Sequence, residues 1–219
     1  MTMKPSLLER LQRKLGRYAI PNLMLYIVAG MAIVFVVDMV VTPMTGFSAR
    51  GLFAFSRSLI LRGQVWRLLT FIFIPPSSSS LWIIFTLYIY WLFGSGLQQQ
   101  WGSFRFNLFY LCGIVGSAIA GMITGYTTNT YLNMSLLLAF ALIYPDFQMM
   151  LFFFLPVKIK WLALLDAALL LLMLITGTWA GRLVLALSLA NLALFFWRDA
   201  YQTGKNAYRR YQWKKNWRR

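Results

Sequence analysis

Residues 106–125, FNLFYLCGIVGSAIAGMITG, form a run of twenty residues without a single charge. A bilayer core about 30 Å thick needs roughly 20 apolar residues per helix, so this run is predicted to cross a membrane. Its small residues Gly113, Ser117, Gly121 and Gly125 recur every four positions, which places them on one face of a helix. Small residues at this spacing predict a packing ridge that a neighbouring backbone can approach closely.

The composition of the whole chain extends this prediction from one segment to the fold. The 219 residues are 60% hydrophobic, 17% aromatic and only 12% charged, which excludes an ordinary soluble globular protein. We expect an all-α integral membrane protein with six transmembrane helices. The single cysteine, Cys112, excludes a disulfide framework within the chain, and no cofactor or metal is expected.

The predicted layout is one membrane domain, residues 19–197, between a basic cytoplasmic segment, residues 1–18, and a basic and aromatic cytoplasmic tail, residues 198–219. A long interfacial loop with short helices is expected between the first and second spans. The stretch 149–160 is expected to return along the cytoplasmic boundary. The six expected spans cover residues 21–41, 81–96, 106–125, 132–145, 161–176 and 183–197.

The distribution of charge predicts the orientation of the chain. The net charge is +16, and sixteen of the 21 Lys and Arg residues lie in segments expected inside, against five outside. This bias predicts both termini in the cytoplasm of a bacterial-type inner membrane. Because the basic residues crowd the two ends and form no known nucleic-acid module, no nucleic acid is expected as a partner. The tail alternates Tyr and Trp with Lys and Arg, which favours anionic lipid, with ribosomal RNA or an acidic partner as alternatives.

Three motifs in register resemble the rhomboid superfamily of intramembrane proteases and its inactive, derlin-like relatives. They are GQVWRLLTF at 63–71, FGSGLQQQWGSFRFNLFYL at 93–111, and NMSLLLAFALIYPDFQMMLFFFLPVKIKWL at 133–162. Gln98 stands where bacterial rhomboids usually carry glutamate. The resemblance implies a rhomboid-like six-helix bundle, with Trp66 and Arg67 in the motif of the first loop. These two residues either brace the loop, which we favour, or contact a substrate or lipid.

The same resemblance implies where catalytic groups would lie in an active member of the family. The nucleophile position on the fourth helix is occupied by Ser135, but Asn133 and Leu136 replace the glycines of the glycine-any-serine-glycine motif. Trp82 and Thr86 fill the positions of the family's histidine and asparagine that hold the oxyanion. Ser135 is therefore either a relic lining a polar dip or, as we favour, a small residue that packs between helices.

The catalytic base implied by the resemblance is missing. Ser188 stands at the histidine position of the sixth helix, and Asn191 and Phe195 replace the two glycines that follow it. The chain contains no histidine at all, so no other register can supply an imidazole. A serine is too weak a nucleophile without a base, which predicts that the protein is not an enzyme. The bulk of Leu136, Asn191 and Phe195 is predicted to fill or reshape the former active site.

Three functions remain open at this point. The first, which we favour, is a rhomboid pseudoprotease that binds transmembrane segments of other membrane proteins in quality control or trafficking. The second is a small transporter or lipid-handling protein built on Asp166, the one acid deep in a predicted span, with Asn133 and Asn191 as further polar groups. The third is a protease that uses an unrecognised base. Asp166 has a structural alternative too, as a carboxyl hydrogen-bonded to a neighbouring helix.

Overall fold

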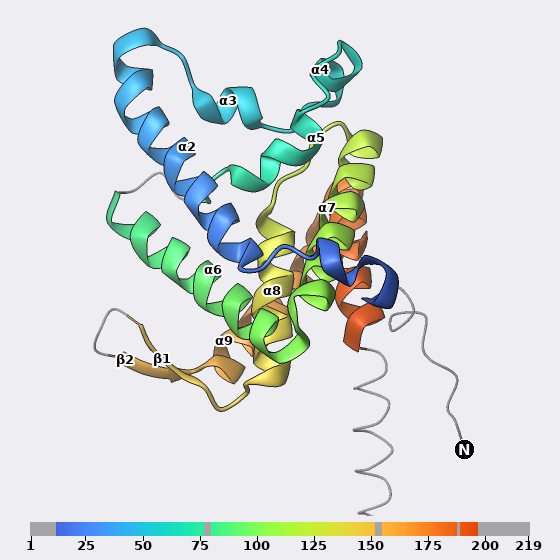
Figure 1. Cartoon of the computed structure of the whole chain (residues 1–219). Helices are drawn as coiled ribbons and strands as arrows, with labels where there is room; N and C mark the ends of the chain where they lie inside the picture. The colour runs from blue at the N-terminus through green and yellow to red at the C-terminus, as the bar shows by residue number, and fades with distance from the viewer. Residues whose placement is uncertain (1–11, 77–79, 152–154, 188, 197–219) are drawn as a thin grey trace, which may run out of the picture.

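The structure is a computed structural model of the chain, and it describes residues 12–76, 80–151, 155–187 and 189–196 (Figure 1). These residues are mostly helical. The elements in chain order are η1 (Gly16–Tyr18), α2 (Leu23–Thr45), α3 (Ala49–Phe53), α4 (Arg57–Leu61), α5 (Arg67–Thr70), η2 (Phe71–Phe73), α6 (Ser80–Trp101), α7 (Ser103–Thr124), α8 (Thr130–Ile143), β1 (Gln148–Leu151), β2 (Leu155–Lys158) and α9 (Ile159–Thr176). A further helix, Trp179–Phe196, follows α9 and passes residue 188, which is outside the described residues.

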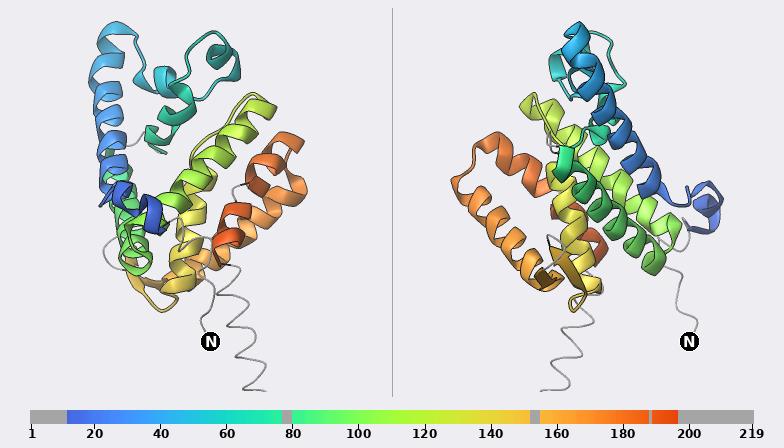
Figure 2. Two further views of the ribbon diagram at one scale, coloured as in Figure 1. Left: turned by 45° about the vertical axis from the view of Figure 1, so that its right-hand side comes forward. Right: turned by 90° about the vertical axis from the view of Figure 1, so that its left-hand side faces the viewer.

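The helices form a bundle with the short elements gathered at its two ends. Helix α2 packs against α6, α6 packs against α7 and α8, and α8 packs against α9. Both views in Figure 2 place α2 on the opposite side of α7 and α8 from the pair made by α9 and the helix Trp179–Phe196. Helices α3 and α4 lie at one end of the bundle, and the β1–β2 hairpin and η1 lie toward the other (Figure 1).

Helix α2 is longer than the predicted first span. It starts after Asn22, which adopts the left-handed conformation with φ 53°, and it continues to Gly46, with φ 69°. Pro43 lies inside its last turn. Pro43 has no N–H to donate to the helix, yet α2 extends four residues beyond the predicted end at Val41. Glycine at the end of the helix takes the left-handed conformation without a steric penalty.

The segment between α2 and α6, called here the α2–α6 loop (residues 46–76), contains α3, α4, α5 and η2. The prediction of a long loop with short helices is confirmed. Ser48 begins α3 as its N-cap, accepting a hydrogen bond from the Gly51 N–H at 3.2 Å. At the other end of the loop, the Asn129 amide donates to the carbonyls of Ile72 and Ile74 at 3.1 and 2.8 Å, which ties the loop to the start of α8.

The structure is mostly helical, as expected of an all-α membrane protein, but it contains one short hairpin that was not predicted. Strands β1 and β2 form an antiparallel hairpin in which Gln148 pairs with Lys158 and Met150 with Pro156. The Ile159 N–H then donates to the Phe147 carbonyl at 2.9 Å, which extends the pairing to the start of α9. At an apolar boundary, the backbone groups of such a segment must find partners within the protein. The hairpin supplies these partners in the stretch that was expected only to return along the cytoplasmic boundary.

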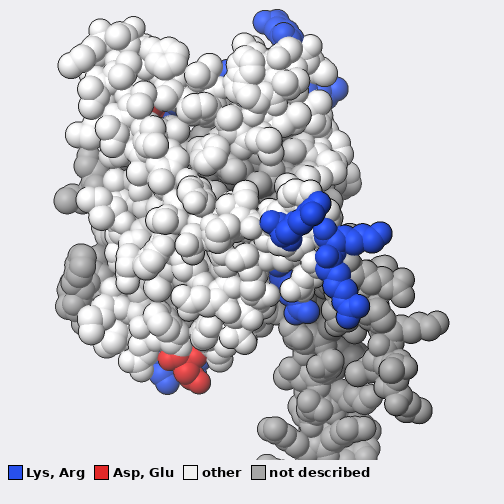
Figure 3. Space-filling view, in the orientation of Figure 1, with Lys and Arg blue, Asp and Glu red and all other residues white. Residues whose placement is uncertain are grey.

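Among the described residues, four helices are long and apolar enough to cross a membrane, namely Gln12–Thr45, Ser103–Thr124, Ile159–Thr176 and Trp179–Phe196. Helix α8 is apolar but has only 14 residues, and α6 has 22 residues with two tyrosines and a run of three glutamines. Apart from a group of basic side chains on the right at the level of η1, the face in Figure 3 shows a broad uncharged belt. This belt lies between basic groups near α4 and charged groups at the hairpin end. The protein is therefore a mostly helical, membrane-embedded, multi-pass protein.

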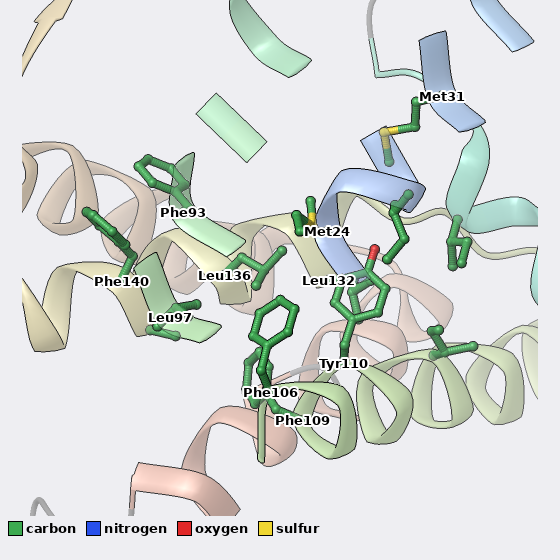
Figure 4. Close-up of a cluster of buried hydrophobic side chains, with 14 of the residues drawn as sticks. Met24, Met31, Phe93, Leu97, Phe106, Phe109, Tyr110, Leu132, Leu136 and Phe140 are labelled. Atoms are coloured by element: carbon green, nitrogen blue, oxygen red, sulfur yellow. The ribbon is translucent and has the colours of Figure 1, made fainter. Parts of the chain in front are cut away.

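The core is a close-packed cluster of large apolar side chains from α2, α6, α7 and α8 (Figure 4). Met24 and Leu136 are completely buried in it, and the rings of Phe93 and Phe140 lie 4.8 Å apart. The buried side chain of Leu136 fills the interior at this level. Phe195 also fills space, because its ring packs edge-to-face on Phe109 at 5.3 Å.

The predicted small-residue ridge on α7 is only partly correct. Gly113, Ser117 and Gly121 are buried within α7, but Gly125 lies past its end with φ 92° and terminates the helix. The ridge meets side chains rather than a backbone: Leu132 and Asn191 at Gly113, and Phe55 and Thr127 at Gly121. The close backbone approach occurs instead at Gly116, where a Cβ atom would lie 3.6 Å from the Leu187 carbonyl oxygen.

Candidate functional site

Ser135, the residue at the nucleophile position, lies on the buried face of α8. Its side chain is 2% exposed, and its Oγ donates a hydrogen bond to the Leu132 carbonyl of its own helix at 2.6 Å. A hydroxyl bound to the preceding helical turn is satisfied without any partner from another element. This geometry fits the packing role, and it directs the Ser135 proton toward a carbonyl rather than toward a base.

Trp82 and Thr86, which the rhomboid resemblance assigns to the oxyanion positions, lie one turn apart on α6. Thr86 donates its hydroxyl to the Trp82 carbonyl one turn earlier at 2.8 Å, and the Trp82 side chain is half exposed. Ser188, at the position of the family's histidine, lies outside the described residues. Among the described residues, no group of three or more His, Cys, Asp or Glu side chains could hold a metal ion.

Asn133 and Asp166, the two strongest candidates for a polar core, converge from α8 and α9. Both are buried, with 3% and 6% of their surface exposed. Asp166 lies on the narrow buried face of α9 with Ile159 and Leu170, while most other positions of this helix are exposed. The third member is Tyr90 of α6, whose hydroxyl interacts with the Asn133 side chain and electrostatically with Asp166. Polar groups from α8 and α9 thus each interact with Tyr90 of α6.

This polar core is incompletely satisfied. Neither polar atom of the Asn133 amide, nor Asp166 Oδ2, forms a hydrogen bond of good geometry within the described part of the chain. The Tyr90–Asn133 contact is therefore looser than a well-formed hydrogen bond. Polar groups without partners inside a membrane protein are costly, and ionisable residues there are functional candidates for that reason. The arrangement can bind a proton, a water molecule or a polar group of another molecule.

Two tyrosines of this region were not predicted. Tyr90 completes the polar core, and Tyr110 of α7, which is 1% exposed, interacts electrostatically with Tyr90. Figure 4 shows the Tyr110 ring rising from α7 toward α2, and no described residue accepts or donates a hydrogen bond at its hydroxyl. The signal that could have revealed them is a hydroxyl in the middle of an apolar span, which needs a partner when it is buried.

Asn191, the third predicted polar-core residue, does not join Asn133 and Asp166 through its amide N–H. Its Nδ2 instead donates to the Phe109 carbonyl of α7 at 2.9 Å. The contact depends on Gly113, one turn further along α7, because a Cβ atom there would lie 3.1 Å from Asn191 Nδ2. Asn191 therefore joins the helix Trp179–Phe196 to α7, and its role is packing between helices.

Arg67 makes the contacts expected of a residue that braces the α2–α6 loop. Its guanidinium is 4% exposed and donates to the Gln64 side chain at 2.7 Å and to the carbonyls of Gly51 and Ala54 at 2.8 and 2.6 Å. The planar fork of arginine can reach several acceptors at once. Trp66 precedes α5 and is 45% exposed. Its anchoring at the level of the lipid headgroups stays a prediction.

Asp38, near the C-terminal end of α2, is a second organising residue of this loop. Its carboxylate forms an ion pair with Arg50 at 2.9 Å and accepts the backbone N–H of Ala49 at 2.6 Å. Negative charge at the N-terminus of a helix is stabilising, so Asp38 holds α3 against α2. The signal was available in Ser48, a helix-capping residue ten positions after the aspartate.

At the opposite end of the bundle, Asp146 lies 3.6 Å from Lys158 and 3.5 Å from Lys160. These pairs are exposed and contribute little to stability. The predicted lipid-binding tail, residues 198–219, and most of the basic N-terminal segment lie outside the described residues. A comparison of the chain with protein-family models, with curated proteins and with solved structures found no match.

Proposed function

We propose that this chain is a catalytically inactive, rhomboid-like membrane protein that binds the transmembrane segments of other membrane proteins. The observation that carries the proposal is the absence of histidine from all 219 residues, together with a Ser135 hydroxyl that is bound to its own helix. Further support comes from the three rhomboid-like motifs, which follow one another in the family's order. The buried Leu136 adds to it, because bulk replaces a glycine beside the former nucleophile.

In this proposal the chain crosses an inner membrane six times, with both termini in the cytoplasm. Helices α6 and α8 supply the second and fourth crossings. Helix α8, with 14 residues, spans a hydrocarbon core only where its ends are shielded by protein or the bilayer is thin. The basic tail rests on the anionic cytoplasmic leaflet.

Cysteine labelling tests this topology in a background in which Cys112, the single cysteine, is replaced by alanine. A cysteine at Thr178, between α9 and the next helix, is expected to react with a membrane-impermeant maleimide in intact cells. A cysteine at Gln100, near the end of α6, is expected to react only after permeabilisation. Labelling of both from the same side would contradict six crossings, because three spans separate Gln100 from Thr178 and an odd number of spans places them on opposite sides of the membrane.

The proposed activity is tested with a purified single-pass membrane protein reconstituted together with this chain. A photoreactive residue at Ile84, a highly exposed position of α6, is expected to crosslink to the transmembrane segment, while the segment stays uncleaved. Ser135→Ala is expected to leave crosslinking unchanged, because its hydroxyl contacts only α8. Cleavage that disappears in Ser135→Ala would overturn the proposal and establish proteolysis. If Ile84 crosslinked to lipid alone, the proposal that the chain binds transmembrane segments would be contradicted.

The second candidate function, a small transporter or lipid-handling protein, is favoured by one observation, the incompletely satisfied polar core of Tyr90, Asn133 and Asp166. Asp166→Asn distinguishes the two functions, because it removes the charge and keeps the shape of the side chain. Under the client-binding proposal, this variant crosslinks as the unaltered protein does. Transport would be favoured if Asp166→Asn lost cellular function but crosslinked normally, while Ser135→Ala kept its cellular function.

A further inference from the structure

An apolar groove with a volume of about 520 Å³ runs between α5 and α7, away from the polar core. On one side it is lined by Val65, Leu68 and Leu69, and on the other by α7 side chains from Ile114 to Ile123. Its outer positions, such as Ile119 and Ile123, are 50% and 59% exposed. The groove is therefore open along a helix that is long and apolar enough to lie in a bilayer.

The dimensions of the groove match one half of a bilayer. The α7 side covers residues 114–123, which at 1.5 Å per residue corresponds to about 14 Å. One leaflet of a hydrocarbon core about 30 Å thick measures roughly 15 Å. The volume also lies in the usual range of ligand pockets, about 300–1,000 Å³. An extended acyl chain of one leaflet has a suitable shape and length for this site.

Two arginines, Arg57 and Arg62, lie at the two ends of α4, next to one end of the groove. The Arg57 N–H donates to the Gly125 carbonyl at the end of α7 at 3.3 Å, so α4 begins where the groove ends. Arg62 closes the other end of α4, three residues before Val65 of the groove wall. Both arginines are exposed, and neither has an ion-pair partner among the described residues. Figure 3 shows basic side chains at this corner, above the uncharged belt.

A transmembrane helix fits this surface less well than a lipid. Helices that pack in membranes use small residues four positions apart at the contact. Along the groove, the residues four positions apart are Ile114, Ala118 and Met122, with only one small residue among them. The neighbouring row is Val115, Ile119 and Ile123, with none. The surface therefore lacks a close-packing face for a second helix.

We infer that the groove between α5 and α7 binds one acyl chain of an anionic phospholipid, whose phosphate group lies at Arg57 and Arg62. The inference is independent of the proposed function, because the groove shares no lining residue with the polar core or with Ser135. Binding here would anchor the α2–α6 loop to the leaflet on the α4 side.

The test uses the full chain reconstituted in vesicles with phosphatidylglycerol that carries a diazirine in its acyl chain. Photolabelling mapped by peptide mass spectrometry is expected to concentrate on residues 114–123 rather than on α9. Ala118→Trp and Ile119→Trp fill the groove from a partly buried and an exposed position and are expected to lower this labelling severalfold. Ala168→Trp, at an exposed alanine of α9, serves as the matched control and is expected to change nothing.

The headgroup contribution is measured with the double variant Arg57→Gln, Arg62→Gln. Two probes with the same acyl chain are compared, one with a phosphatidylglycerol and one with a phosphatidylcholine headgroup. The labelling ratio of the first to the second is expected to fall by roughly tenfold in this variant, since two basic contacts are lost. Equal labelling of α7 and α9, or labelling that neither tryptophan in the groove reduces, would overturn the inference. Crosslinking of a photoreactive residue at Ile119 to a protein helix in place of lipid would also overturn it.

Discussion

Replacing Arg67 with leucine is expected to release the α2–α6 loop from the bundle. Three hydrogen bonds from the buried guanidinium join Gln64, Gly51 and Ala54, and leucine offers no donor to any of them. Hydrogen bonds to charged groups contribute about 1.5–3 kcal/mol each, and a buried carbonyl left without a partner adds a similar cost. The expected loss of stability is about 3–5 kcal/mol, measured by thermal unfolding in detergent and by the rate of proteolysis within the loop.

Two variants separate this effect from a simple loss of charge. Arg62→Leu removes an exposed arginine from the same loop and is expected to leave stability within about 0.5 kcal/mol. Arg67→Lys keeps the charge, but a single ammonium group cannot hold the same planar arrangement of acceptors. Its stability is therefore expected to lie between those of Arg67→Leu and Arg62→Leu. Equal stability of Arg67→Leu and Arg62→Leu would show that the guanidinium does not organise the loop.

Gly121→Leu is expected to have the second large effect, because α7 and the α2–α6 loop meet at this glycine. A Cβ atom at Gly121 would lie 2.6 Å from the Phe55 ring and 2.8 Å from the Thr127 methyl group. Phe55 is 2% exposed and packs edge-to-face on Phe71 at 6.0 Å, so it has little room to move. Overpacking of a core costs about 1–3 kcal/mol, and a whole leucine side chain is expected to reach or exceed the upper value in detergent unfolding.

Gly116→Ala is the matched control on the same helix. A Cβ atom there would lie 3.6 Å from the Leu187 carbonyl oxygen, which is an ordinary contact. Alanine also favours a helix over glycine by about 1 kcal/mol, so this variant is expected to be neutral or slightly stabilising. If the clash is the cause, Phe55→Leu should restore part of the stability that Gly121→Leu loses. Absence of any such coupling would contradict the packing explanation.

Some positions in the candidate site were predictable because their properties are local. Ser135 and Asp166 stand out as polar residues in apolar runs, and the bracing role of Arg67 follows from the many donors of a buried guanidinium. The hairpin at 148–158 was missed because a short apolar run has no periodicity that distinguishes strand from helix. The end of α7 at Gly125 agrees with the predicted span, but the place of Gly125 in the ridge was wrong, because glycines four apart fit a helix face up to the residue that terminates it.

The amino-acid sequence by itself determined that the chain lies in a membrane, that it is mostly helical, and that it can supply no imidazole to a serine. These properties depend on composition and on the lengths of apolar runs, which act residue by residue. Only the tertiary structure decided that Tyr90, Asn133 and Asp166 meet, that Asn191 bonds to Phe109, and that a groove opens beside α7. Such contacts join residues tens of positions apart, and they depend on how the helices rotate and cross when their side chains pack, which no local pattern encodes.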